Sequence, residues 1–145
     1  MFENLKREAV MFVREPMDKE EALNRIIFRA CEVFRIPDCD SILSSIIDRE
    51  SKLSTGIGLG VAVPHCRSEK VQKIITAVML AARSIEYNSV DGQPVRLIFL
   101  IISPVHDVQG HIACLSTISH AVSDEETRKR LMDSRSDEEL FDNLR

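Results

Sequence analysis

Residues 54–66, which read STGIGLGVAVPHC, have side-chain types and a spacing that could do chemistry. Glycine occupies every second position early in this stretch, and glycine lets a backbone bend sharply or approach another group closely. The apolar residues that follow predict a short buried strand, which Pro64 ends because proline has no N–H for the ladder. We therefore expect the imidazole of His65 at the mouth of a strand, beside a loop whose backbone N–H groups could hold an oxyanion.

The composition is that of one ordinary folded domain covering residues 1–145. Hydrophobic residues make up 44% and charged residues 29% of the chain, which is long enough to bury a sizeable core. The net charge of -4 is opposite to that of a nucleic-acid-binding surface, so we expect no nucleic-acid partner. No apolar run reaches the length of a membrane span and no signal peptide is visible, so we expect a cytoplasmic protein without direct membrane insertion.

The four cysteines stand alone in the sequence, without a C-x-x-C pair. In a chain without a visible secretory leader, we expect reduced thiols, most of them small core residues: Cys31, Cys39, Cys66 and Cys114. Because Cys66 directly follows His65, we hypothesise that the site is sensitive to oxidation of this thiol.

Hydrophobic periodicity predicts helices and strands that alternate along the chain. Apolar residues recur every three to four positions in 18–34, in 38–50 and in the last quarter of the chain, which is typical of amphipathic helices. Short runs rich in β-branched residues predict strands at 9–13, 74–82 and 95–102, the last covered on both faces. This order predicts an α/β fold, a three-layer α/β/α sandwich with a small mixed β-sheet flanked by helices.

Motifs outside the central stretch fit one known pattern. Arg49 and Glu50 precede STGIG and GVAVPHC, and a DG-x-P-V turn stands before the central strand in IEYNSVDGQPVRLIFLIISP. The pattern continues through GHIACLSTISHAVSDEETRKRL to SDEELFDNL near the C-terminus. On these residues the chain resembles the type-2 IIA (EIIA type 2) domains of the bacterial phosphotransferase system, the fructose/mannitol-type IIA domains and their nitrogen-regulatory relatives.

The resemblance implies an activity and the residues that carry it. It identifies His65 as the phosphoryl acceptor, His111 as a second active-site histidine and Arg49 as the arginine of the motif. The chain would then be a phosphotransferase, a phosphohistidine carrier of the phosphoenolpyruvate-dependent system that accepts its phosphoryl group from HPr or a nitrogen-branch HPr paralogue. Neither a cofactor nor a metal is implied, since the group moves between two imidazoles.

The same residues suit this chemistry without the family name. Neutral imidazole, with a pKa of about 6.5, is a good nucleophile near pH 7. Phosphoryl transfer asks mainly for positioning and charge stabilisation, which the planar fork of Arg49 and one N–H of His111 could supply. We predict further phosphate-binding donors in the hydroxyl of Thr55 and in the backbone at Thr55, Gly56 and Gly58.

Two positions depart from the family pattern. The family often has Asn where this chain has Leu59, so a polar contact at that position would be lost. Ahead of the second histidine the family commonly has acidic or polar residues, whereas residues 107–110 here read DVQG. We expect the change at 107–110 to bear on the docking surface and on the identity of the phosphoryl donor, rather than on the acceptor.

Three alternatives compete with a phosphoryl carrier. A binding module of the same fold without phosphoryl chemistry is the first, and the presence of both histidines and the arginine argues against it. A cysteine hydrolase using Cys66 lacks a matching nucleophile context. The third is a metal site, for which no recognised ligand spacing is complete, built from His65, His106, His111 and Cys114. Outside such a site, His106 and His120 are predicted to be structural or exposed.

The sequence favours a regulatory role over a transport role. No IIB domain or membrane segment is attached to the chain, which leads us to expect a free-standing nitrogen-regulatory IIA protein acting on target proteins. A fructose/mannitol-type sugar-transport component that passes its phosphoryl group to a separate IIB domain is the alternative.

Overall fold

Six strands form one mixed sheet in the computed structural model, which describes Phe2 and residues 5–145. The order across the sheet is β1-β5-β6-β3-β2, and β4 also pairs with β6. The β5–β6 and β2–β3 pairs are antiparallel, while β1–β5, β3–β6 and β4–β6 are parallel. The strands are β1 (Val10–Val13), β2 (Gly56–Gly58), β3 (Val61–Ala62), β4 (His65–Ser68), β5 (Ile75–Ile85) and β6 (Val95–Pro104).

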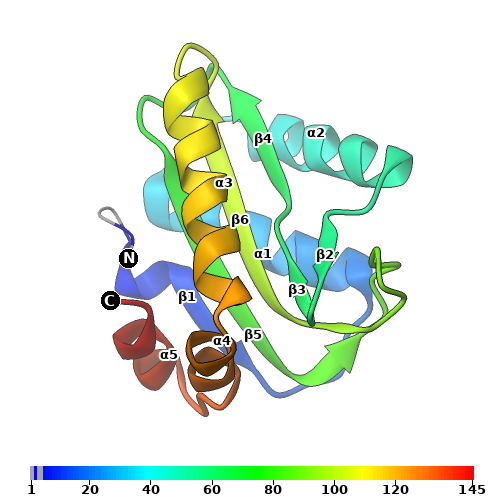
Figure 1. The fold of residues 1–145 in the computed structure, drawn as a ribbon. Coiled ribbons are helices and arrows are strands. Elements are labelled where there is room, and N and C mark those ends of the chain that lie inside the picture. Colours follow the sequence, from blue (N-terminus) through cyan, green and yellow to red (C-terminus); the bar gives the residue numbers. More distant parts are fainter. Residues whose placement is uncertain (1, 3–4) are drawn as a thin grey trace.

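Helices cover both faces of this sheet (Figure 1). One face carries α1 (Lys19–Phe34) and α2 (Cys39–Lys52), and the other carries α3 (Val108–Ser123), α4 (Glu125–Met132) and α5 (Asp137–Leu144). A short 3-10 turn, Arg7–Ala9, precedes β1. Side chains of β6 alternate between the two cores: Ile98 and Leu100 pack with α1 and α2, whereas Phe99 and Ile101 pack on the opposite side. The predicted three-layer sandwich with a doubly covered central strand is confirmed.

Side-chain caps begin the helices. Asp18 caps α1 and Asp38 caps α2, each through a carboxylate that accepts a backbone N–H of the first turn. The carboxylates of Asp107 and Asp124 cap α3 and α4 in the same way, and the hydroxyl oxygen of Ser136 accepts a backbone N–H at the start of α5. Within the described residues, none of the helices is long and apolar enough to cross a membrane.

Pro64 interrupts the strand that precedes His65 but does not end its ladder, contrary to the expectation from the sequence. β3 pairs Val61 with Leu97, and β4 resumes the same parallel pairing along β6 with His65 opposite Ile101. Proline lacks only the donor, and the Pro64 carbonyl still accepts the N–H of Ile101 at 3.1 Å. The histidine is therefore held as the first residue of a strand instead of emerging from a strand end.

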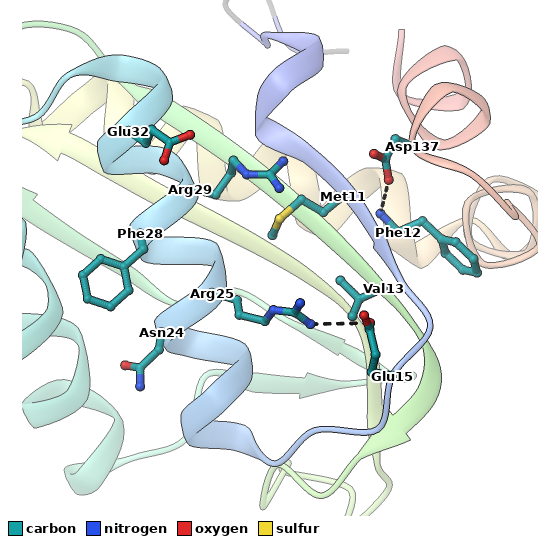
Figure 2. Close-up of a pocket in the computed structure, with 10 residues that line it drawn as sticks. All are labelled: Met11, Phe12, Val13, Glu15, Asn24, Arg25, Phe28, Arg29, Glu32 and Asp137. Carbon is teal, nitrogen blue, oxygen red and sulfur yellow. Dashed lines mark hydrogen bonds and ion pairs between the residues drawn. The ribbon is translucent and has the colours of Figure 1, made fainter.

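The edge strand β1 is covered on its outer side (Figure 2). Asp137 of α5 accepts the N–H of Phe12 at 2.7 Å, which removes one open backbone donor from the edge. Between β1 and α1 lies a surface hollow of about 430 Å³, across which Arg25 pairs with Glu15 at 3.6 Å. None of the predicted site residues lines this hollow.

The expectation of four free thiols is wrong for two of them. Cys31 near the end of α1 and Cys39 at the start of α2 form a disulfide, with their Cα atoms 5.9 Å apart. The short connection between the helices contains two residues in the left-handed region, Arg35 (φ 53°) and Asp38 (φ 56°), which turn the chain back so that the two cysteines meet. Cys66 and Cys114 are free.

Candidate functional site

The structure brings two of the predicted site residues into contact. His65 begins β4, and His111 lies in the first turn of α3. Their ring centroids are 5.4 Å apart and the ring planes are inclined by 56°. Because β6 pairs with β4 and leads through a short turn into α3, one strand sets the positions of both rings.

A backbone contact determines which ring nitrogen of His65 carries the proton. Its Nδ1 lies 2.7 Å from the carbonyl oxygen of Val63. A carbonyl can only accept a hydrogen bond, so Nδ1 carries the proton and the neutral ring has its lone pair on Nε2. His65 is half-buried and lines a pocket, and Nε2 is the ring nitrogen whose lone pair is free.

His111 has a partner of its own in β6. Its Nδ1 lies 2.7 Å from the hydroxyl of Ser103, a fully buried residue that the sequence argument overlooked. Burial lowers the pKa of His111, and the nearby His65 and Arg67 lower it further. The ring is therefore neutral near pH 7, and when Ser103 donates to Nδ1 the remaining ring proton lies on Nε2.

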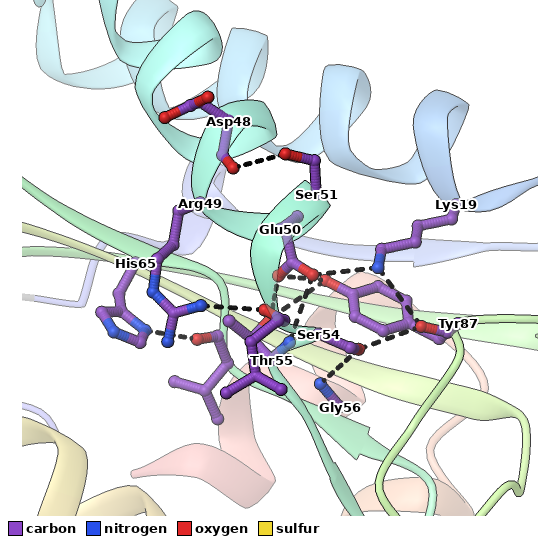
Figure 3. Close-up of polar contacts among 12 residues, drawn as sticks. Lys19, Asp48, Arg49, Glu50, Ser51, Ser54, Thr55, Gly56, His65 and Tyr87 are labelled. Carbon is purple, nitrogen blue, oxygen red and sulfur yellow. Dashed lines mark hydrogen bonds and ion pairs between the residues drawn. The ribbon is translucent and has the colours of Figure 1, made fainter.

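Arg49 reaches the same site from the end of α2. Its Nη1 donates to the carbonyl of Leu53, the residue that ends the helix, at 2.8 Å. Figure 3 shows the guanidinium directed toward the side of the hairpin where His65 lies. Both side chains line one pocket of about 380 Å³, between the 54–63 segment and α3, whose other lining residues are Ser54, Thr55, Ile57, Gly58, Leu59, Val63, Leu115, Ser119, Val122 and Ser123.

The glycine-rich segment forms a tight hairpin between β2 and β3. Three consecutive residues have positive φ: Gly58 (96°), Leu59 (61°) and Gly60 (77°). Glycine adopts this region freely, but at Leu59 it is the conformation that Asn and Gly favour. The Asn that the resemblance led us to expect at this position would suit this backbone conformation, and the Leu59 side chain that stands there is exposed.

Several N–H groups expected to be free in the hairpin already have acceptors. The N–H of Thr55 donates to Glu50, that of Gly56 to the hydroxyl of Ser54, and that of Leu59 to Asp91. The Thr55 hydroxyl also donates to Glu50. The phosphate-binding roles of Thr55 and Gly56 stay predictions that these contacts do not support, while Gly58 lines the pocket beside His65.

Glu50 is the centre of a buried polar cluster that sequence reasoning missed (Figure 3). Its carboxylate accepts from both donors of Thr55, from the hydroxyl of Tyr87 at 3.1 Å, and pairs with Lys19 at 2.9 Å. Burial, together with the Glu50 charge, raises the pKa of Tyr87, so that its hydroxyl remains a donor. A signal was present: Glu50 continues the spacing of the buried residues Ile42 and Ile46 on the apolar face of α2.

The alternative sites find no support in the geometry. Within the part of the chain that the structure describes, no group of three His, Cys, Asp or Glu side chains could hold a metal ion. His106 and His120 are exposed, as predicted. Burial raises the pKa of the Cys66 thiol to about 11, so that it is protonated near pH 7 and unsuited to nucleophilic attack.

Comparisons with known proteins identify the family of the chain. Residues 3–145 match the family model described as phosphoenolpyruvate-dependent sugar phosphotransferase system, EIIA 2. A fructose-specific EIIA component from Haloferax volcanii is 28% identical over 137 residues, which are 94% of this chain and 89% of that protein. The crystal structure of the nitrogen regulatory protein IIA-Ntr from Neisseria meningitidis has a TM-score of 0.83 and 25% identity, covering 94% of each chain.

A third comparison concerns a complex. The mannitol IIA enzyme of Escherichia coli, solved together with phosphorylated mannitol IIB, has a TM-score of 0.82 and 21% identity, and the match covers 97% of this chain and 96% of that one. At this identity the likeness is one of fold. The predicted resemblance is confirmed by the family match over nearly the whole chain: the protein belongs to the EIIA type 2 family of the phosphoenolpyruvate-dependent phosphotransferase system, whose members carry phosphoryl groups between proteins.

Proposed function

We propose that this protein accepts a phosphoryl group on Nε2 of His65. The observation that carries the proposal is the contact between Nδ1 of His65 and the Val63 carbonyl, which leaves the lone pair on Nε2 in the neutral ring. The family match supports phosphoryl transfer as the general activity, and the contact of Nδ1 supports Nε2 as the accepting atom.

The transfer is an in-line displacement between two imidazoles. The Nε2 lone pair attacks the phosphorus of a phosphohistidine on the donor, a P–N bond forms to His65, and the donor's P–N bond breaks. The electron pair of the broken bond returns to the donor nitrogen, which takes a proton from solvent. As Nε2 bonds to phosphorus, positive charge develops on the His65 ring, and the Val63 carbonyl that accepts Nδ1–H stabilises it.

Two neighbours would stabilise the transferred group. Arg49 uses one N–H on the Leu53 carbonyl, and its remaining guanidinium donors are available for phosphoryl oxygens. The lowered pKa of His111 keeps its ring neutral, so the ring does not repel the positive charge that develops on His65. It can also donate one N–H to the same oxygens.

For the partners, we propose HPr or its nitrogen-branch paralogue as donor and a nitrogen-regulatory role for the phosphorylated chain. The likeness to IIA-Ntr over 94% of both chains supports this role. The likeness to a fructose-specific EIIA component supports the second candidate, a transport component that passes the group to a separate IIB domain. In either role we propose that the protein acts in the cytoplasm, as expected from the sequence.

Labelling of His65 tests the proposal. The chain is incubated with ³²P-labelled phospho-HPr or with the labelled nitrogen-branch paralogue, and incorporation is followed by autoradiography. We expect His65→Ala to abolish labelling and His120→Ala, an exposed histidine on the same protein, to leave it intact. Labelling that persists in His65→Ala would refute the assignment of the acceptor.

Onward transfer separates the two roles. Labelled chain is mixed with purified fructose- or mannitol-type IIB domains, and loss of its label to IIB is measured. We expect retention of the label, as for a regulator. Rapid transfer to IIB, particularly if a membrane permease is encoded beside this chain, would favour the transport component instead.

A further inference from the structure

We infer that Glu50, Lys19 and Tyr87 form a positioning device that holds Arg49 and the hairpin in the geometry needed for phosphoryl transfer. The inference rests on the proposed function of His65. None of these three side chains lines the His65 pocket, so they would act through the residues that do.

Every hydrogen-bonding position of the Glu50 carboxylate that faces the protein is used. Oε1 accepts the hydroxyls of Thr55 and Tyr87, and Oε2 accepts the N–H of Thr55 at 3.1 Å and pairs with Lys19 Nζ at 2.9 Å. The Glu50 side chain is only 4% exposed, against 25% for Lys19. A carboxylate saturated by four donors from three other places in the chain has little freedom to move.

The position of the Glu50 carboxylate is energetically unfavourable for a negative charge. It lies near the C-terminal end of α2, where the helix dipole disfavours negative charge, and it is buried. An apolar residue there would continue the buried face of α2 begun by Ile42 and Ile46 at lower cost. The four donors offset the burial of the charge, and what the arrangement provides beyond stability is a defined geometry.

That geometry extends directly to the phosphoryl site. Arg49 is the neighbour of Glu50, and its guanidinium is fastened to the carbonyl of Leu53, two residues before Thr55. Figure 3 shows Arg49 and Glu50 leaving the end of α2 in different directions, Arg49 toward His65 and Glu50 toward Tyr87. A shift of the Glu50 carboxylate would therefore move the guanidinium and the first residue of the hairpin together.

Tyr87 and Lys19 complete the device from behind the hairpin. The Tyr87 carbonyl accepts the hydroxyl of Ser54 at 3.0 Å and Lys19 Nζ at 3.3 Å, while that Nζ lies 4.3 Å from the centre of the Tyr87 ring. These contacts join the start of α1 and the β5–β6 connection to the hairpin. Tyr87 is fully buried and cannot touch a partner protein, so its hydroxyl can influence transfer only through Glu50 and Thr55.

The test separates positioning from docking by kinetics. Single-turnover transfer from ³²P-labelled phospho-HPr, or from the paralogue that labels the wild-type chain, is measured over a range of donor concentrations. We expect Tyr87→Phe and Lys19→Met each to lower the rate at saturating donor by about 10-fold, with the half-saturating donor concentration changed less than about 2-fold. Lys19→Arg, which keeps the cation, should recover most of the rate.

Lys52→Met is the matched control. Lys52 lies on α2, as Glu50 does, but it pairs with Asp48 on the surface. We therefore expect no change in the rate at saturating donor or in the half-saturating donor concentration. Thermal denaturation of each variant confirms that it is folded at the assay temperature, so that a lower rate does not reflect unfolded protein. A second readout needs no phosphorylation: the ¹⁵N chemical shift of the Arg49 Nε–H group, measured by NMR on the unphosphorylated chain. We expect this shift to change in Tyr87→Phe and to stay the same in Lys52→Met.

The outcomes distinguish the two claims. If the wild-type chain is labelled on His65 but Tyr87→Phe and Lys19→Met transfer at its rate, or change only the half-saturating concentration, the positioning inference is overturned and the proposed function stands. If the wild-type chain is not labelled on His65, the proposed function fails. The Arg49 shift then still decides the inference, since an unmoved signal in Tyr87→Phe removes it.

Discussion

The segment from Arg49 to His65 contributes to two polar clusters that use their atoms in opposite ways. In the cluster around Glu50, each carboxylate oxygen accepts two donors, and the side chain is almost inaccessible. In the pair of His65 and His111, each ring engages its Nδ1, with the Val63 carbonyl and the Ser103 hydroxyl respectively. Among the described residues, the Nε2 atoms of both rings have no hydrogen-bond partner. The first cluster therefore uses all its polar atoms inside the protein, whereas the second leaves one nitrogen of each ring free.

Removing the centre of each cluster should give the sharpest contrast. Glu50→Ala leaves Lys19 and the buried Tyr87 hydroxyl without their shared acceptor, and we expect the free energy of unfolding to fall by about 3 kcal/mol. His65→Ala should lower it by less than about 1 kcal/mol while abolishing phosphorylation. Urea denaturation followed by circular dichroism measures both, and equal losses of stability would contradict the division between the clusters.

The disulfide allows the same comparison at the other end of α2. Glu50 fastens the C-terminal end of this helix, and the Cys31–Cys39 bond fastens its first residue across a sequence separation of 8. Closing so short a loop predicts that reduction, or the double change Cys31→Ser and Cys39→Ser, lowers the free energy of unfolding by about 2–3 kcal/mol. Cys114→Ser serves as the control for loss of a thiol, and identical unfolding curves with and without reductant would disprove the effect.

Leu59, in the hairpin between the two clusters, has a backbone conformation that its own residue type disfavours. Its φ of 61° favours Asn, so Leu59→Asn should raise the free energy of unfolding by about 0.5 kcal/mol. Ile57→Asn is the matched control, because Ile57 is similarly exposed in the same hairpin but has an ordinary φ. A gain of the same size in both variants would show that surface polarity, and not the backbone, is responsible.

The smallest expected effect is a pH dependence from His111. Burial and neighbouring positive charge hold its pKa in the folded protein below the ordinary value of 6.5, so below that pH the unfolded chain binds more protons. The contribution of His111 to the free energy of unfolding is therefore complete above about pH 6.5 and declines as the pH falls. Urea titrations from pH 7.5 to 5 should show a shallower decline for His111→Gln, and parallel curves would count against a shifted pKa.

The layers of the fold, and the place of His65 on a strand beside the glycine-rich hairpin, could be predicted because their signals are local. Periodic apolar residues mark α1 and α2, the run at 95–102 marks the doubly covered strand, and His65 follows a recognisable motif. The meeting of His65 with His111 followed from the family resemblance, and the parallel pairing of β4 with β6 explains it.

The features that sequence reasoning missed depend on residues far apart in the chain. The hairpin donors of Thr55 and Leu59 find acceptors in Glu50 and Asp91, which no local pattern connects with them. The disulfide depends on left-handed residues in the connection between α1 and α2, and no motif specified that geometry. Glu50 is recognisable in the sequence as a charge at an apolar spacing, but that spacing does not indicate that Lys19 and Tyr87 supply its partners.

The interrupted strand before His65 makes this site sensitive to changes of length. Val61 and Val63 face the α3 side of the sheet, Ala62 and Cys66 face the α1–α2 side, and His65 continues the first set. Because side chains alternate strictly along a strand, deletion of one residue between Gly60 and Pro64 would turn the imidazole into the core beneath α2 and bring the Cys66 thiol to face His111. A substitution in this segment leaves the imidazole on the α3 side of the sheet, whereas a register shift of one residue would put the Cys66 thiol in its place.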